Sequence, residues 1–154
     1  MAGRPFGHAI IGADDAKRAK DYERQVCEAR GFTGEGRHFE VTHLGEIALA
    51  RWFNWQRITY EWDRKPEGRR AEGYDFKLAG RRWVHVRTAT ASWHRSLIIP
   101  WSSFQNLNTD LYAAMRLESE AKVSLLGFFF RRGLLDRGDT LRRDPGDGKK
   151  PEVW

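Results

Sequence analysis

The sequence predicts an α/β fold, in which helices pack on a sheet of strands. Two segments near the N-terminus place apolar residues at helical spacing, and later segments alternate apolar and polar residues as half-buried strands do. The chain has 154 residues, of which 40% are hydrophobic, and this is enough for one core without disulfide bonds. We therefore expect one domain over residues 1–136 and a polar C-terminal tail, rich in Gly and Pro, over residues 137–154.

Two helices are predicted first. Residues 14–30 begin with the cap candidates Asp14 and Asp15, and Gly31 follows them as a helix terminator. A second helix is predicted from about Thr42, because an apolar stripe with the period of a helix follows. The stripe consists of Leu44, Ile47, Leu49, Ala50 and Phe53.

Strands are predicted after the helices. Residues 57–63 alternate in the manner of a half-buried strand, and residues 73–89 contain two strand-like arms on either side of a turn at Gly80. In the second arm, alternation puts Trp83, His85 and Arg87 on one face and Val84 and Val86 on the other. Residues 96–102 form a further apolar strand whose Pro100 favours its end or a sheet edge. By pattern alone, residues 110–126 suit either a helix or a pair of strands.

The positive charge is concentrated in the middle of the chain. The whole sequence has 27 Lys and Arg against 21 Asp and Glu, a net charge of +6, and residues 64–95 alone hold nine basic residues and three acidic ones. Six of the seven Trp lie between residues 52 and 101, and such a mixture of cationic and aromatic residues is typical of nucleic-acid binders. The alternative is a solvated basic face above core Trp residues. The predicted nucleic-acid contacts are Arg69, Arg70, Arg81, Arg82, Trp93 and Arg95.

Several classes of protein are disfavoured. No apolar run approaches 18 residues and the N-terminus has no long apolar segment, so we expect neither a membrane span nor a secretory signal. The single cysteine, Cys27, cannot form an internal disulfide, and a cytoplasmic location is expected. The sequence also lacks the CxxC, HExxH, P-loop and GxSxG motifs of common zinc, nucleotide-binding and serine-hydrolase sites.

One constellation suggests chemistry. Glu46 lies on the second predicted helix, Asp75 at the start of the hairpin, and His85 and Arg87 at alternate positions of its second arm. This order resembles the PD-(D/E)XK nuclease superfamily over about residues 42–135. The resemblance is carried by THLGEIALARWF, by GYDF, by HVRTA where the family has (D/E)VKTA, by LIIP, and by LYAAMRL and VSLLGFFF.

The resemblance implies a restriction-endonuclease-like fold, with a mixed sheet of about five strands flanked by helices and strands over residues 111–130. It also implies metal-dependent hydrolysis of DNA phosphodiesters, with Mg²⁺ or Mn²⁺ held by Glu46, Asp75 and His85 and with Arg87 at the phosphate. A bacterial or phage role in DNA processing would follow, and many such nucleases are homodimers. The sequence departs from the family at two positions. His85 replaces the second family acid, and Mg²⁺ prefers oxygen ligands to an imidazole nitrogen. Arg87 replaces the family Lys, and an arginine stays protonated and cannot act as a general base. Lys77, two residues after Asp75, can supply a further cation.

Other functions stay open at this point. A nuclease fold that has lost hydrolysis would bind nucleic acid or assemble with a protein partner. A metal-free site would use His43, His85 and His94 as acid and base on RNA. A structural component of a larger particle would hold its C-terminal tail against neighbours. Finally, the three-residue pattern can arise by chance on a polar strand.

Overall fold

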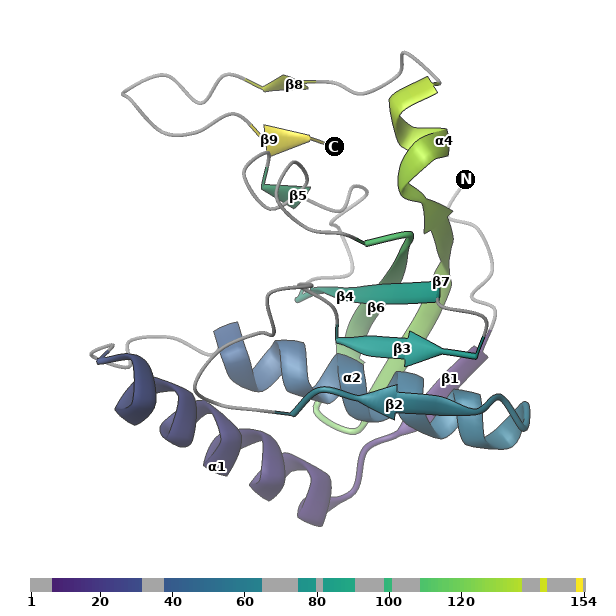
Figure 1. Ribbon diagram of the computed structural model, residues 1–154. Helices are drawn as coiled ribbons and strands as arrows, with labels where there is room; N and C mark the ends of the chain where they lie inside the picture. The colour runs from purple at the N-terminus through teal and green to yellow at the C-terminus, as the bar shows by residue number, and fades with distance from the viewer. Residues whose placement is uncertain are drawn as a thin grey trace.

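Figure 1 shows the computed structural model of the chain, whose main feature is a six-stranded sheet with two long helices on one side of it. The structure describes residues 7–31, 38–64, 75–79, 82–90, 99–100, 109–136, 142–143 and 152–153.

The two long helices are α1 (Ala13–Arg30) and α2 (His38–Trp55). As predicted, α1 ends at Gly31, whose φ of 69° is the left-handed conformation that glycine adopts readily and whose N–H bonds to the Cys27 carbonyl. The helix α2 begins at His38, about one turn before the predicted start. The prediction placed the start too late because it relied on the apolar stripe, which begins only at Leu44.

The main sheet has the strand order β1-β7-β6-β4-β3-β2. Its strands are β1 (Gly7–Ile10), β2 (Tyr60–Trp62), β3 (Phe76–Leu78), β4 (Arg82–Ala89), β6 (Leu111–Ser119) and β7 (Lys122–Phe130). Only β4 and β6 pair in parallel, and the other neighbours are antiparallel, so the sheet is mixed. A short helix, α4 (Arg131–Asp136), follows β7. A small second sheet has the order β5-β9-β8, with β5 (Ile99–Pro100), β8 (Arg142–Arg143) and β9 (Glu152–Val153).

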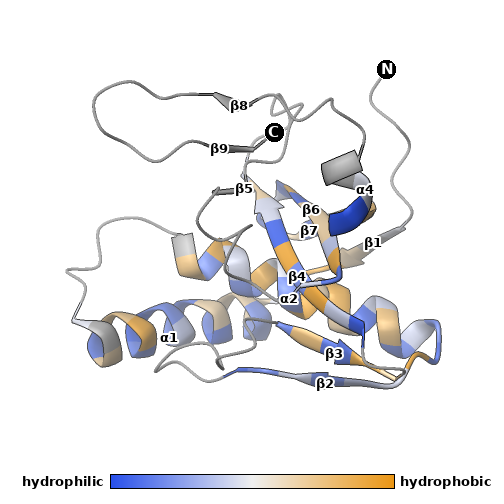
Figure 2. Ribbon diagram, turned by 45° about the horizontal axis from the view of Figure 1, so that its top comes forward, coloured by the Kyte–Doolittle hydropathy of each residue, from blue (hydrophilic) through white to orange (hydrophobic). Residues whose placement is uncertain are grey.

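The helix α2 lies between α1 and the main sheet. It packs on β1, β4, β6 and β7, whereas α1 packs on α2. This layering explains why residues 43–50 of α2 are all buried, although an amphipathic helix on a protein surface would bury only one stripe. In Figure 2, α1 carries a mixture of hydrophilic and hydrophobic turns, as expected of a helix with one face on α2 and one in solvent.

Alternation along the strands divides the sheet into two faces. Phe76, Val84 and Val86 join the core with α2, together with Met115 and Leu125 of β6 and β7. His85 therefore points to the opposite face, where its ring meets Tyr112 of β6 edge-on at 5.8 Å between centroids. The predicted division of the second hairpin arm into two faces is confirmed for Val84 and Val86, which are buried in the core.

A close approach of backbone fixes α2 against β4. A Cβ placed on Gly45 would lie 2.0 Å from Thr88 Oγ1 and 3.2 Å from Thr88 Cβ, so only glycine fits at this crossing. The next residue of α2 is Glu46. The contact therefore sets the position of the predicted acidic residue relative to the sheet.

The α/β prediction is confirmed, and residues 111–130 form a strand pair rather than a helix. The main sheet has six strands instead of about five, because the short segment Gly7–Ile10 pairs with β7. The strand predicted over 57–63 is shorter, since Arg57 adopts a left-handed conformation (φ 56°) after α2. The described part of the tail includes the two short strands β8 and β9.

Candidate functional site

The site is built first from α2, which carries two ionisable side chains into the interior. His43 and Glu46 are 6% and 4% exposed and stand three residues apart, so they share one face of the helix. The His43 Nδ1 atom lies 3.4 Å from Glu46 Oε2. The Tyr22 ring of α1 stacks on the His43 ring at 4.1 Å between centroids.

Glu46 is bound from the sheet side by an indole. Trp62 of β2 donates from Nε1 to Glu46 Oε2 at 3.1 Å. Burial raises the pKa of Glu46, and the nearby Asp75 carboxylate raises this pKa further, while His43 and Trp62 act in the opposite direction. The Glu46 and Asp75 carboxyl groups therefore lie near enough to interact electrostatically inside the protein.

Asp75 lies at the bend where the chain enters β3, and the neighbouring strands fix its position. Its backbone N–H donates to the Val84 carbonyl at 3.0 Å, and its carbonyl accepts from the Asp63 N–H at 2.8 Å. The carboxylate Oδ2 accepts from the Val86 N–H at 2.7 Å and lies 2.9 Å from His85 Nδ1. The hairpin thus holds Asp75 by both its backbone and its side chain.

The structure brings together three of the residues selected from the sequence: Glu46 and Asp75 interact electrostatically, and Asp75 contacts His85. Arg87 is partly buried, two residues from His85 on the same face of β4. Lys77 of β3 is also partly buried and stands in register between Glu61 of β2 and Trp83 of β4.

Sequence reasoning missed the role of Trp62 and gave His43 only a metal-free role. The spacing of His43 and Glu46 on one helix was a signal for their pairing. The bond from Trp62 to Glu46 joins β2 to α2, and no local pattern indicates it. For the metal-free hypothesis, His43 lies beside Glu46 and His85 beside Asp75, whereas His94 lies outside the described residues.

The donor atoms decide what the site can hold. Within the described ranges, no three His, Cys, Asp or Glu side chains are arranged to hold a metal ion among them. Mg²⁺, however, is commonly held by one or two carboxylates, with water and substrate phosphate as the other ligands. Two interacting buried carboxylates fit that pattern, because a divalent cation would relieve the repulsion that raises the pKa of Glu46. His85 lies behind Asp75, as the buried partners of carboxylate ligands often do.

Of the predicted nucleic-acid contacts, Arg82 is exposed at the start of β4. The other five lie outside the described residues: Arg69, Arg70, Arg81, Trp93 and Arg95.

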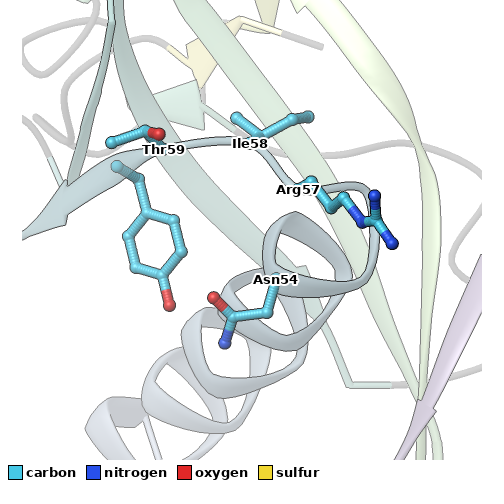
Figure 3. Close-up of a pocket in the computed structure, with 5 residues that line it drawn as sticks. Asn54, Arg57, Ile58 and Thr59 are labelled. Carbon is cyan, nitrogen blue, oxygen red and sulfur yellow. The ribbon is translucent and has the colours of Figure 1, made fainter.

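A surface depression of about 500 Å³ lies at the end of α2, lined by Asn54 and residues 57–60. Figure 3 shows the Arg57 guanidinium directed away from Asn54. Among the described residues that line the depression there is neither an acidic residue nor a histidine, and none of them belongs to the Glu46 and Asp75 cluster.

Comparison with known proteins adds no assignment. The chain has no significant match to a protein-family model, to a curated protein or to a solved structure. None of the described helices is both long and apolar enough to cross a membrane.

Proposed function

We propose that this protein is a nuclease-like protein that hydrolyses DNA phosphodiester bonds with Mg²⁺ or Mn²⁺ held by Glu46 and Asp75. The observation that carries the proposal is that two buried carboxylates, one on α2 and one at the start of β3, interact electrostatically, and that Asp75 belongs to the most basic segment of the sequence. Holding two carboxyl groups close together in the interior costs stability, and such costs are concentrated at functional sites.

Each side chain has a part in the proposed reaction. Glu46 and Asp75 would bind the ion, which when bound lowers the pKa of a coordinated water and offsets phosphate charge. His85 would keep the Asp75 carboxylate oriented, together with the Val86 N–H. Arg87 and Lys77 are the cations that would stabilise negative charge on the phosphate.

The order of elements supports a restriction-endonuclease-like arrangement as part of this proposal. A helix with the GE pair is followed by β2, by the β3–β4 hairpin, and by β6 parallel to β4. These elements coincide with the segments on which the sequence resemblance rests. A cytoplasmic bacterial or phage role in DNA processing, and a homodimer, are further parts of the proposal.

The second candidate is a nuclease fold without hydrolysis that binds nucleic acid or a protein partner. It is favoured by His85, which stands at the position of the second family acid and is wholly buried against Asp75 and Tyr112. A side chain in that environment resembles a structural residue more than an exposed ligand.

The test is incubation with linear, circular, branched and single-stranded DNA in Mg²⁺ or Mn²⁺, comparing wild type with Asp75→Asn. Asparagine keeps an oxygen that can accept from the Val86 N–H but loses the charge that binds a cation. The proposal predicts metal-dependent cleavage by wild type and a loss of about 100-fold or more in the variant. Asp21→Asn, on the surface of α1, serves as the matched control and should cleave normally.

Cleavage that survives Asp75→Asn would refute the site assignment. DNA binding without cleavage of any substrate would favour the second candidate.

A further inference from the structure

Arg64 lies just beyond the end of β2 and directly follows two residues that bond to the acidic residues of the proposed site. Its Cζ atom is 4.9 Å from the centre of the Trp62 ring, and the same indole donates to Glu46. The intervening residue, Asp63, donates its backbone N–H to the Asp75 carbonyl. The two residues before Arg64 are thus bonded to the two acidic residues, one through its side chain and one through its backbone.

The Trp62 ring on which Arg64 lies is itself held in place by its neighbours. Its ring stacks on His43 at 5.6 Å and on Phe76 at 5.3 Å between centroids, in addition to the bond from Nε1. Contacts to a helix and to the neighbouring strand leave the indole few alternative rotamers. A guanidinium that stacks on this ring is therefore held in a defined place.

The donors of Arg64 suit a phosphate ligand. A guanidinium held by an aromatic ring still carries five N–H donors in its own plane, in a fork that matches phosphate oxygens. Arg64 is exposed, and within the described part of the chain the structure records neither a hydrogen bond nor an ion pair for it. Its position also suits the electrostatics, because a cation at the rim would reduce the repulsion between two carboxylates and an approaching phosphate.

We propose that Arg64, held by its cation–π contact with Trp62, binds a backbone phosphate of DNA at the rim of the Glu46 and Asp75 site. This inference rests on the proposed function and extends it with a specific substrate contact. A contact to phosphate positions the strand but reads no base, so its loss should affect all DNA sequences alike.

The test is DNA binding by fluorescence anisotropy over a series of salt concentrations, in EDTA so that no cleavage occurs. The variants are Arg64→Gln, Arg64→Lys and the control Arg24→Gln, an exposed arginine of α1. Arg24 stands two residues from Tyr22, on the opposite side of α1 from the contact with His43. Unfolding in urea and the near-ultraviolet circular dichroism of the Trp residues verify that each variant is folded.

The proposal predicts that Arg64→Gln weakens binding about tenfold and lowers the slope of log affinity against log salt by about one. Arg64→Lys should keep the slope, because the charge remains, and weaken binding less than Arg64→Gln does. The control Arg24→Gln should change neither quantity.

The outcomes separate this inference from the proposed function. An Arg64→Gln variant with unchanged affinity and slope would overturn the phosphate contact, even if wild type cleaves DNA. The expected loss in Arg64→Gln together with an absence of cleavage would overturn hydrolysis and support the contact. A wild-type protein that binds no DNA would overturn both.

Discussion

Replacing Glu46 by glutamine should make the protein more stable at neutral pH. The Glu46 side chain is only 4% exposed, so burial disfavours its ionised form, and the nearby Asp75 carboxyl disfavours it further. Desolvation of a buried ion costs several kcal/mol. Each hydrogen bond to a charged group offsets about 1.5–3 kcal/mol of this desolvation cost, and the partners of Glu46 are Trp62 and His43. Glutamine keeps an oxygen for Trp62 and removes the charge, so a gain on the order of 1–3 kcal/mol is expected.

The gain should depend on pH in one direction. Burial and Asp75 raise the pKa of Glu46 in the native state above its ordinary value. Below the pKa of the unfolded chain the side chain is protonated in both states, so wild type and Glu46→Gln should be equally stable there. As the pH rises from the unfolded pKa toward the native pKa, the unfolded chain ionises while the buried side chain stays protonated, so wild type loses stability that the variant keeps.

The assay is urea unfolding of both proteins at pH 4 and pH 8. Glu28→Gln, on the exposed side of α1, is the matched control and should show little change at either pH. If Glu46→Gln is no more stable than wild type at pH 8, the buried Glu46 carboxyl does not lower the free energy of unfolding, and the reasoning is refuted.

Two further predictions concern the parts of the fold that support the site. Burial raises the pKa of Asp15, but hydrogen bonds from Arg51 and the Gly12 N–H lower it below its ordinary value overall. Asp15→Asn should therefore lose about 1–3 kcal/mol at pH 7, and urea unfolding should show the loss shrinking below about pH 4; a loss that is independent of pH would contradict this. Gly45→Ala should lose about 1–3 kcal/mol because its Cβ would overlap Thr88. A double-mutant cycle with Thr88→Ala should recover at least about 0.5 kcal/mol of that loss, whereas strict additivity would argue against the close contact.

Local periodicity predicted much of the fold correctly. The α1 boundary at Gly31, the apolar stripe of α2 and the two faces of β4 each follow from spacing within one segment. The strand Gly7–Ile10 was missed because four residues are too few to establish a period, and it is ordered by pairing with β7. The choice between helix and strands over 111–130 came from family resemblance, since helix propensity and strand pattern conflict in that segment.

The site was predictable in its residues but not in its interactions. Glu46, Asp75 and His85 were selected because of their order along the chain. The fold places Asp75 in contact with His85 and near enough to Glu46 to raise its pKa. The burial of every residue over 43–50 of α2, between α1 and the sheet, was not predicted, because an amphipathic stripe indicates only one buried side. The bond from Trp62 to Glu46 depends on that packing, and so do the raised pKa of Glu46 and the position of Arg64.

The central claim is that Glu46 and Asp75 act together as one metal-dependent site. The most direct measurement is the rate of DNA cleavage in Mn²⁺ and in EDTA for wild type, Glu46→Gln, Asp75→Asn and the double variant. Residues that serve one step as a unit show non-additive losses. We predict that EDTA abolishes cleavage and that each single variant loses nearly as much rate as the double variant. Independent, multiplying losses, or cleavage that persists in EDTA, would contradict the account.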